Sequence, residues 1–457
     1  MNPKLWQRLQ RQLALGELRL DEPTLSAHSG DKWFATGKPE AVALPRSAKS
    51  VSAILRFAQR HQIPVTPRGA GYGYVGGCVP VRGGIVLSTA KMRRIREINE
   101  RDFVAVIQPG VITADLQNKA EAKGLYYPPD PASRADCSLG GNIATNAGGP
   151  RSLKYGVTSD YVLGLQFALP DGTLVRVGGR AHKNKTGFDF SRFFTGTEGL
   201  LGIVTEATLK LLPLPPFRAA LSVGLGSMHV ATRGIAAVFK AGYLPSALEV
   251  ADEFTLRAAT KRTGSDRFNG CRAHLIIELD GQEKSVRSEL RDLKKLMTPL
   301  KPRFIDAAFG VEKVETIWQL RREFSYSLRD TGLVKLNEDI VVPRGKLEEL
   351  FVFAARLQKK HAMPIACFGH AGDGNIHVNV MVDETRPGHA RRRDAALDEL
   401  FRWVLKHDGV ITGEHGIGLA KKRWWPLAVP AEVRRLHQTV KDALDPKGIM
   451  NPGKFLN

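Results

Sequence analysis

The first half of the chain alternates segments with helical and with strand-like spacing of apolar residues. The apolar side chains of residues 51–61 fall on one helical face, which predicts a helix that Ser50 caps and that ends before Pro64. Short apolar runs at 83–88 and 103–108 are typical of strands. This alternation predicts an α+β fold for the first half.

The pattern continues to a cluster of prolines and then resumes. A helix is predicted over 113–123, closed by Gly124, and a strand followed by a turn over 161–177. The proline cluster at 213–216 marks the clearest domain boundary. Beyond it we predict helices at 231–241, 284–296, 346–360, 394–407 and 431–444, and strands at 273–279 and 376–382. This mixture of helices and strands predicts an α+β fold for the second half as well. No internal repeat is visible, which argues against a solenoid.

The N-terminal residues combine apolar and basic positions. Leu5, Leu9 and Leu13 recur with helical spacing, and basic residues lie between them. Such a helix either docks on its own domain or touches anionic lipid. The segment lacks the uninterrupted apolar stretch of a secretory signal, and no other stretch approaches the roughly 20 apolar residues of a spanning helix. We therefore expect a soluble or peripheral protein.

Composition and charge narrow the class of protein. The 457 residues, 43% of them hydrophobic, suffice for two or three domains with a large core. The four cysteines form no CxxC pair, which argues against a zinc ribbon, an iron–sulfur site or a disulfide framework and favours a reducing compartment. A net charge of +21 favours anionic partners. The basic clusters are short and scattered, so we expect no nucleic acid among those partners.

Three glycine-rich segments lie in the first half. Residues 69–77 formally satisfy GxGxxG, but no helix pattern follows, so they are weak evidence for a Rossmann fold. Their backbone N–H groups could instead wrap a pyrophosphate, with Arg68 adding charge; the alternative is a surface turn. The blocks at 137–156 and 196–204 place small residues where a chain could approach a flat ring or phosphates closely. We interpret both as loops of a cofactor cradle.

The second half contains a candidate metal site. His370 and His377 flank the turn-forming sequence AGDGN, which can bring two imidazoles towards one point, and His377 shares a strand face with Asn379. Glu414, in GEHGIG, is a third candidate ligand beside the titrating His415. Two imidazoles and a carboxylate suit zinc, and also Mn, Fe or Co, with open positions for substrate oxygens.

Six ordered motifs give the chain a family resemblance from about residue 38 onward. They are PRGAGYGYVGG, CSLGGNIATNAGG, GFDFSRFFTGTEGLLGIVTEATLKL, GHAGDGNIHVNV, GEHGIGLAKK and DPKGIMNPGKF. Together they resemble the FAD-linked D-2-hydroxy acid dehydrogenases, which include glycolate oxidase flavin subunits and D-lactate and D-2-hydroxyglutarate dehydrogenases.

The resemblance implies a fold and a division of the chain. Residues 1–37 would be a helical lead-in, and 38–216 an FAD-binding domain of the vanillyl-alcohol oxidase type with two α+β subdomains. Residues 217–457 would form an α+β cap with an antiparallel sheet, which binds substrate and metal, and a C-terminal segment that returns to the flavin.

The resemblance also implies the residues that hold FAD. They are Arg68, Gly69, Ala70, Gly71, Tyr72, Gly73, Ser138, Leu139, Gly140, Gly141, Asn142, Ala144, Thr145, Asn146, Gly149, Gly199, Gly202, Ile203 and Val204. Some relatives attach FAD covalently through a histidine in the first loop, at the position that resembles Tyr72. We therefore predict non-covalent FAD; a link through Cys137 is the alternative.

By the same resemblance, His370, His377 and Glu414 bind the metal and His415 is the catalytic base. The substrate carboxylate would be bound by Arg321, the arginine of a WxxR pattern, with Arg322 as the second choice, and Asn379 would help to hold the substrate. Several relatives carry a lysine where this chain has Asn337, with Lys335 two residues earlier. This departure argues against a dicarboxylate substrate.

Together these features predict an FAD-dependent, metal-assisted dehydrogenase of a small D-2-hydroxy acid such as D-lactate or glycolate. Flavin N5 would take a hydride, although a carbanion path uses the same residues. Electrons would leave to a separate acceptor: an iron–sulfur subunit, a quinone, an electron-transfer flavoprotein or a cytochrome. We expect a cytoplasmic protein, with peripheral contact at the inner membrane as an option. The alternatives are an electron-transfer subunit without substrate oxidation and a non-oxidative FAD enzyme of the same superfamily.

Overall fold

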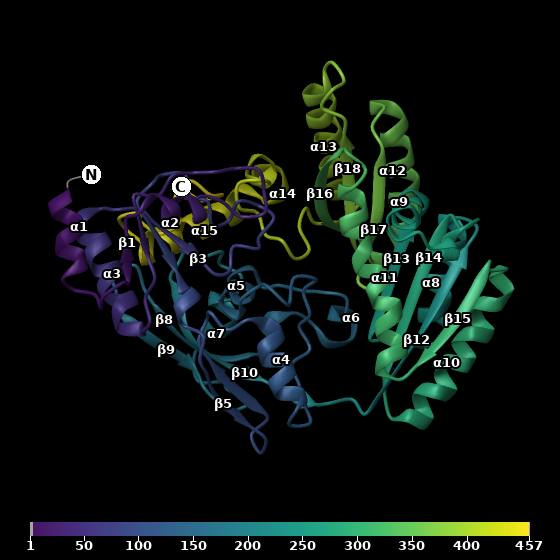
Figure 1. Cartoon of the computed structure of the whole chain (residues 1–457), viewed down its shortest axis with the longest axis horizontal. Helices are drawn as coiled ribbons and strands as arrows, with labels where there is room; N and C mark the ends of the chain where they lie inside the picture. Colours follow the sequence, from purple (N-terminus) through teal and green to yellow (C-terminus); the bar gives the residue numbers. More distant parts are fainter. Residues whose placement is uncertain (1–2, 457) are drawn as a thin grey trace. The chain divides into compact units, whose positions relative to one another are not determined.

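The backbone passes between two units four times. The computed structural model describes residues 3–456. Unit 1 contains the chain up to Gly148, Val157–Leu214 and the segment that begins at Glu414. Unit 2 contains Gly149–Gly156 and Pro215–Gly413. Each unit has sheets and helices of its own, in keeping with the predicted α+β class (Figure 1).

Unit 1 is built on two main sheets. Its strands are β1 (Leu18–Arg19), β2 (Ala41–Ala43), β3 (Val65–Arg68), β4 (Ile85–Ser88), β5 (Ile95–Asn99), β6 (Val104–Ile107), β7 (Leu125–Tyr126), β8 (Val162–Ala168), β9 (Leu174–Gly178), β10 (Ile203–Lys210) and β11 (Leu212–Pro213). The first sheet has the order β1-β2-β4-β3, with β2 and β3 parallel to β4. The second, β5-β6-β10-β8-β9, is antiparallel throughout, and β7 pairs with β11.

The helices of unit 1 fill the space around these sheets. They are α1 (Pro3–Gln10), α2 (Glu22–Ala27), α3 (Ala48–His61), α4 (Thr113–Glu121), α5 (Leu139–Thr145), α7 (Phe190–Phe194), α14 (Trp425–Ala428) and α15 (Ala431–Leu444). The buried face of α3 shares one core with strands of both sheets, including Ile85 and Ile203. Trp6 and Leu9 of α1 are buried in the same core, so this amphipathic helix docks on its own unit.

Two sequence predictions about these helices were wrong. The first is the cap of α3: Ser47, not Ser50, accepts the hydrogen bond from the N–H of Ser50, at 3.1 Å, so the helix begins three residues earlier than predicted. The second is the block at 137–156, which we interpreted as a loop. Its first part forms α5, because Ser138 caps it and Leu139 and Ile143 are buried.

Unit 2 is built on a seven-stranded antiparallel sheet. Its strands are β12 (Phe217–Leu225), β13 (Ala247–Asp252), β14 (Ala273–Gly281), β15 (Phe304–Phe309), β16 (Val334–Val341), β17 (Ile365–His370) and β18 (Asn375–Val382), in the order β15-β12-β14-β13-β17-β18-β16. Its helices are α6 (Ser152–Tyr155), α8 (Met228–Lys240), α9 (Glu253–Thr263), α10 (Glu283–Met297), α11 (Val311–Arg329), α12 (Leu347–His361) and α13 (His389–Lys406). The predicted helices and strands of the second half are all present, although several bounds differ by a few residues.

The two faces of this sheet differ in chemistry. One face packs on helices such as α8, where Leu275 approaches within 3.3 Å of a Cβ placed at Gly234. The other face carries α9 and α11, whose buried residues share clusters with Ala251, Phe368 and Ile276. On this second face the strands also place a series of buried polar side chains, which form the candidate site below.

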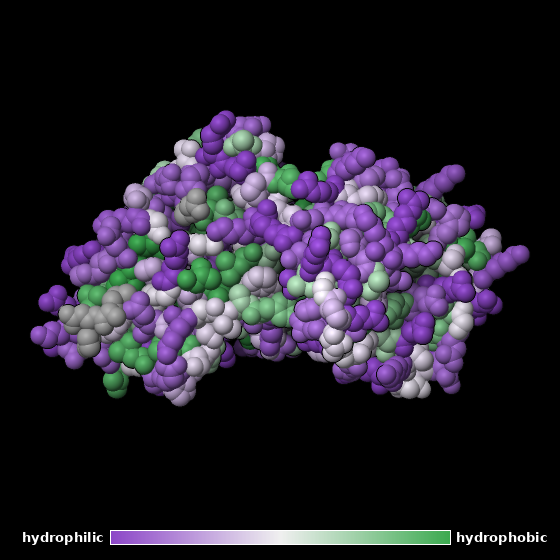
Figure 2. All heavy atoms as spheres, turned by 90° about the horizontal axis from the view of Figure 1, so that it is seen from above, coloured by the Kyte–Doolittle hydropathy of each residue, from purple (hydrophilic) through white to green (hydrophobic). Residues whose placement is uncertain are grey.

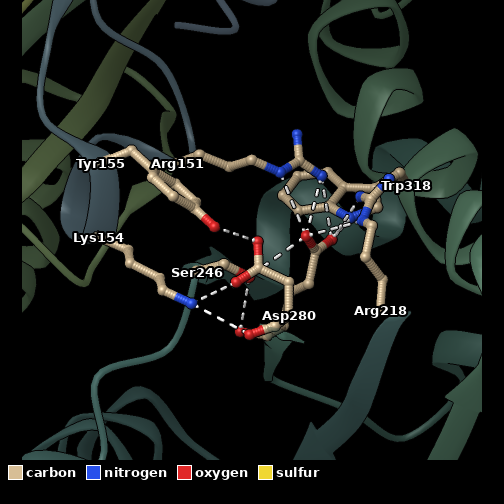
Figure 3. Close-up of polar contacts among 8 residues, drawn as sticks. Arg151, Lys154, Tyr155, Arg218, Ser246, Asp280 and Trp318 are labelled. Atoms are coloured by element: carbon tan, nitrogen blue, oxygen red, sulfur yellow. Dashed lines mark hydrogen bonds and ion pairs between the residues drawn. The ribbon is translucent and has the colours of Figure 1, made fainter. Parts of the chain in front are cut away.

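A buried carboxylate, Glu278, anchors the segment Gly149–Gly156 in unit 2 (Figure 3). The guanidinium group of Arg151 lies 3.0 Å from Glu278, and that of Arg218 lies 2.9 Å from it. Trp318 Nε1 of α11 donates to the same carboxylate. Burial favours the neutral acid, but the two arginine charges outweigh it and lower the pKa of Glu278 to about 2. Glu278 therefore remains ionised at neutral pH.

Replacing Glu278 with alanine should destabilise unit 2. The change removes the counter-charge that Arg151 and Arg218, whose side chains are 14% and 23% exposed, share. Breaking such a buried pair costs about 3–5 kcal/mol. Urea unfolding followed by tryptophan fluorescence measures the loss. The matched control is Glu348→Ala, which removes a surface pair with His229 and should leave the midpoint almost unchanged.

One face of the molecule is mainly polar. Hydrophilic side chains dominate the face shown in Figure 2, and apolar side chains form smaller areas between them. None of the helices within residues 3–456 is both long and apolar enough to cross a bilayer.

Candidate active site

The hairpin β17–β18 places the two histidines of the predicted metal site together. His370 ends β17, and His377 lies on β18 opposite Phe368, so both imidazoles are on the face that α11 covers. Their ring centroids are 5.4 Å apart and both side chains are buried. The turn between them requires glycine at Gly374, because φ there is +86° and a Cβ would lie 2.1 Å from the carbonyl oxygen of Val342.

A second contact fixes the chain just before Glu414. Asp339 Oδ2 accepts hydrogen bonds from Thr412 Oγ1 at 3.0 Å and from the N–H of Gly413 at 2.9 Å. Its Oδ1 accepts a bond from Asn375 Nδ2, at the start of β18. Glu414 follows directly.

His370, His377 and Glu414 are the only group of three potential metal ligands found among the described residues. One ligand atom from each lies within 4.8 Å of the others. Two imidazole nitrogens and one carboxylate oxygen fit a divalent metal with open coordination positions.

A glutamate that sequence reasoning missed lies behind this site. Glu249 of β13 is 1% exposed and pairs directly across the ladder with His370. Its Oε1 lies 2.5 Å from His370 Nδ1, and its Oε2 accepts a hydrogen bond from Arg321 Nε at 2.6 Å. Burial opposes ionisation, but the charges of His370 and Arg321 outweigh it and lower the pKa of Glu249 to about 2.

The two candidate arginines of α11 point in different directions. Arg321 is 8% exposed, and its guanidinium lies 4.8 Å from the ring centroid of Phe368 on the sheet. Arg322 is on the exposed side of the helix and pairs with Glu315. Of the two, Arg321 is thus the one that unit 2 places with the histidines.

Two asparagine side chains lie opposite each other on the sheet face that α11 covers. Asn379 of β18 lies directly opposite Asn337 of β16, and Asn379 is fully buried. Asn379 Nδ2 donates to the carbonyl oxygens of Ala366 and His377, both at 3.0 Å. Neither Asn379 Oδ1 nor Asn337 Oδ1 has a hydrogen-bond partner in the part of the chain that the structure describes. Two buried acceptors are thus available to a ligand.

Lys335 belongs to the same group. It lies two residues before Asn337 on β16, and its Nζ donates to Ser325 Oγ of α11 at 2.8 Å. Its ammonium group is 5.7 Å from the Phe368 ring. Burial, together with the nearby charges of Arg329 and Arg321, lowers the pKa of Lys335 to about 7. The departure from the family pattern at Asn337 argued against a lysine in the substrate site, but Lys335 lies with the candidate substrate residues.

In unit 1 the first glycine segment follows β3 as a loop. The backbone N–H groups of Gly69, Ala70, Gly71 and Gly73 have no acceptor among residues 3–456. Gly71 has φ of +76°, a conformation that suits glycine. Arg68 NH1 donates to the carbonyl oxygen of Gly30 at 2.5 Å, which holds the guanidinium beside the loop. A run of free N–H groups next to a cation fits a pyrophosphate.

The ring of Tyr72, at the tip of this loop, makes a cation–π contact with Lys32. The ammonium group of Lys32 lies 4.5 Å from its centroid.

The partly exposed face of α5 consists of very small residues. Gly140, Gly141, Ala144 and Thr145 are half-buried, whereas Leu139 and Asn142 face the interior of unit 1. Asn142 Nδ2 donates to Thr113 Oγ1 at 2.7 Å, so its role here is to hold the helix. A helix face without large side chains lets a flat ring system approach the backbone closely.

Other predicted cofactor residues have structural contacts of their own. Asn146 ends α5 in the left-handed conformation, and its Oδ1 accepts from the N–H of Ser159 at 2.8 Å. Gly149 lies in the segment assigned to unit 2. A Cβ at Gly199 would come within 2.8 Å of Pro67, and one at Gly202 within 2.7 Å of the carbonyl oxygen of Ala168.

The third block ends in β10. Ile203 is 4% exposed and packs in the core that α3 shares, so its side chain is unavailable to a ligand. Val204 is half-buried and pairs with Phe167 of β8. The backbone of these two residues, rather than their side chains, is what the block can present to a cofactor.

The four cysteines are free thiols. Cys137 is 8% exposed and lies 3.3 Å from Thr113 Oγ1. Burial raises the pKa of the Cys137 thiol, and it raises that of Cys78 to about 11. Neutral thiols are poor nucleophiles, which disfavours a covalent link to a cofactor.

His415 lies in unit 1 beside the first loop. Its ring centroid is 5.3 Å from that of Tyr74, and its Nε2 is 3.8 Å from Glu414 Oε1. The residues after it are fixed by Glu198, whose carboxylate accepts bonds from the N–H groups of Ile417 and Gly418 at 2.8 and 2.9 Å. The imidazole is therefore held on a short, anchored loop.

The C-terminal segment, residues 441–454, bonds to the first and third glycine-rich segments and to Val79, just after the first. Asn451 Nδ2 donates to the carbonyl oxygens of Gly77 and Glu198, at 3.0 and 2.9 Å. Lys454 Nζ donates to Val79 O, and Lys441 Nζ donates to Leu200 O. In the sequence, the motif DPKGIMNPGKF indicated only a family resemblance. The structural role of the motif could not be predicted from neighbouring residues, because the residues that it contacts lie far away in the chain.

Two known domain families match the chain. Residues 39–178 match the family described as FAD binding domain, and residues 214–455 match the family described as FAD linked oxidases, C-terminal domain.

Several curated proteins are similar over nearly the whole chain. Glycolate oxidase subunit GlcD of Bacillus subtilis is 36% identical over 417 residues, which cover 91% of this chain and 89% of that protein. D-lactate dehydrogenase of Anaerostipes hadrus is 31% identical, covering 92% and 90%. D-2-hydroxyglutarate dehydrogenase of Stutzerimonas stutzeri is 32% identical, covering 99% of both chains.

Solved structures of the same fold are more distant in sequence. p-Cresol methylhydroxylase with substrate bound has a TM-score of 0.81 and 17% identity, covering 99% of this chain and 96% of that one. Alkyldihydroxyacetonephosphate synthase has a TM-score of 0.77 and 19% identity, covering 99% and 85%. These likenesses confirm the predicted vanillyl-alcohol oxidase type of fold.

Proposed function

The chain belongs to the family of FAD-linked oxidases, and we propose that it oxidises a D-2-hydroxy acid to the 2-oxo acid with a bound divalent metal. The relatives that share a third of its residues are named for glycolate, D-lactate and D-2-hydroxyglutarate. The observation that carries the proposal is the donor set of His370, His377 and Glu414, with Arg321 on the same sheet face as the two histidines. The first candidate substrates are small acids such as D-lactate and glycolate.

The cofactors divide the chemistry. When bound, FAD accepts the two electrons, and the metal, with zinc as first choice and Mn, Fe or Co as alternatives, makes the substrate hydroxyl more acidic. The free N–H groups of Gly69, Ala70, Gly71 and Gly73 and the small face of α5 would hold FAD without a covalent bond, in keeping with the neutral thiol of Cys137.

Three side chains handle the substrate: Arg321, Asn379 and His415. Glu249 occupies two of the five N–H donors of Arg321, through Nε and NH2, and the other three can bind the substrate carboxylate. Asn379 Oδ1, a buried acceptor, can receive a hydrogen bond from the hydroxyl. His415 would accept the hydroxyl proton as general base.

The acceptor of the electrons is a separate protein or molecule in this proposal. The GlcD relatives are named as subunits, which supports transfer to a partner subunit. A positively charged surface favours docking of an acidic partner or an anionic membrane.

An anaerobic titration tests the proposal. Purified, metal-replete protein is titrated with D-lactate, glycolate, D-2-hydroxyglutarate and the available L-isomers while the visible spectrum is recorded. One D-acid should bleach the flavin band near ~450 nm as the flavin is reduced. A bound flavin that no acid bleaches would favour an electron-transfer subunit or a non-oxidative enzyme instead, and protein without flavin would contradict the proposal that unit 1 binds FAD.

Lys335 favours a second substrate class, the 2-hydroxy dicarboxylates. Its ammonium group and the Arg321 guanidinium both lie against the ring of Phe368, and among the described residues the ammonium group is held by a serine hydroxyl rather than by a carboxylate. A second substrate carboxylate would supply the missing counter-charge.

Replacing Lys335 with methionine separates the two substrate classes. If a dicarboxylate is the substrate, KM for D-2-hydroxyglutarate should rise by about 10–100-fold, because a hydrogen bond to a charged group contributes roughly 1.5–3 kcal/mol. KM for D-lactate should stay within about twofold, since that acid has one carboxylate. Lys294→Met, on α10, is the control. Equal effects on both acids would leave the small acids as the substrates.

A further inference from the structure

Glu249 contacts both a candidate metal ligand, His370, and the candidate substrate-binding residue Arg321. We propose that Glu249 is a positioning residue that sets the orientation of the metal ligand His370 and of the substrate-binding Arg321 together. This inference rests on the proposed function, since it concerns the same metal and substrate groups. In the proposed mechanism, Glu249 itself makes no contact with the reacting atoms.

The sheet register fixes the geometry. Glu249 and His370 are cross-strand partners on β13 and β17, so their side chains emerge side by side on one face. Oε1 lies 2.5 Å from His370 Nδ1, while Oε2 lies 2.6 Å from both Nε and NH2 of Arg321. Each oxygen of the carboxylate thus serves one functional side chain, and almost no water reaches it.

The contact with His370 decides which ring nitrogen can bind a metal. An ionised carboxylate accepts a hydrogen bond, so Nδ1 must carry the proton and Nε2 is left with its lone pair. The guanidinium of Arg321, 2.6 Å from Oε2, supplies the counter-charge of this carboxylate. A carboxylate behind a metal-binding imidazole also fixes the ring plane and raises ligand basicity.

The contact with Arg321 fixes the guanidinium plane. Arg321 comes from the middle of α11, and its long side chain would otherwise have several rotamers. Binding by Glu249 at the Nε edge leaves the opposite edge for a ligand. Because one carboxylate holds both partners, removing the arginine should also loosen the imidazole.

Glu278 offers a matched control. It is also a fully buried glutamate with arginine partners, and it lies on the same sheet face, opposite Ala247 of β13. It also contacts α11, through Trp318 Nε1. Among the described residues its partners are Arg151, Arg218, Ser246 and Trp318 rather than His370, His377 or Glu414, so it shares the burial and charge of Glu249 but not the proposed role.

The experiment measures metal affinity, independently of turnover. Zinc-loaded wild type, Glu249→Gln and Glu278→Gln are titrated with a chromophoric zinc chelator, and FAD content is checked by absorbance. Glu249→Gln should bind zinc about 10–100-fold more weakly, the usual effect of losing such a partner. Glu278→Gln should stay within about twofold, because it contacts no ligand. KM for the substrate should rise in Glu249→Gln as well, since Arg321 loses its orientation.

Arg321→Met provides a second test should Glu249→Gln fail to fold. It touches no metal ligand, yet the shared carboxylate predicts a several-fold loss of zinc affinity. Wild-type affinity in Glu249→Gln, or in Arg321→Met, would overturn the inference while leaving the proposed function intact. A wild-type protein that binds no zinc, manganese, iron or cobalt would overturn both.

Discussion

Replacing His415 with alanine should slow substrate-driven reduction of the flavin by about 10²–10⁴-fold, the usual contribution of a general base. FAD should stay bound, because the glycine-rich segments are held by Glu198, Asn451 and Lys454 rather than by this imidazole. Anaerobic stopped-flow absorbance with saturating D-acid measures the rate, and the flavin-to-protein ratio measures retention.

The control for this prediction is His182→Ala, an exposed histidine of unit 1 whose Nε2 contacts the carbonyl oxygen of Asp102. It should reduce flavin at the wild-type rate. If the His415→Ala protein retains its flavin and is reduced within tenfold of wild type, another group takes the proton and the assignment of the base is wrong.

Removal of the metal should have the next largest effect. His377→Ala removes one of three ligands and should release the metal at micromolar concentrations of chelator, with loss of at least about 100-fold in flavin reduction. This magnitude follows because polarisation of an oxygen by a metal is worth several kcal/mol, and about 1.4 kcal/mol corresponds to a factor of ten. Elemental analysis of the purified protein reports occupancy directly.

A matched histidine distinguishes metal loss from general damage. His361, at the end of α12, contacts Glu399 at 2.9 Å and belongs to no ligand set, so His361→Ala should keep both metal and activity. Wild-type protein treated with chelator should lose activity and regain it with zinc, manganese or cobalt. Full activity of a protein shown to be free of metal would contradict the metal-assisted mechanism.

Local patterns were sufficient for much of the fold. Helices such as α10 and α15 have a clear apolar face, and the proline cluster coincides with the change of unit after Leu214. Where prediction failed, distant contacts decided the outcome. The glycines of α5 indicate a loop by themselves, but Leu139 and Ile143 find a core to pack against, and tertiary packing outweighs their propensity.

The same distinction applies to the candidate site. His370 and His377 were predictable because one short turn joins them. Glu249 was not, since it lies 121 residues before His370 within an apolar strand and only the pairing of β13 with β17 brings the two together. Lys335 lies two residues before the position at which relatives carry a lysine, which suggested that it is not part of the site. The structure nevertheless places its side chain on the sheet face that α11 covers.

The C-terminal segment has a consequence for how the protein is made. Asn451 bonds to Gly77 across 374 residues of chain, and Val65 pairs with the backbone of Ile449 and Asn451. At roughly 5–20 residues per second of synthesis, the first glycine-rich loop exists for about 20–75 s before its partner does. The contacts of Asn451 with Gly77 and Glu198 therefore form only after the residues between them have been synthesised.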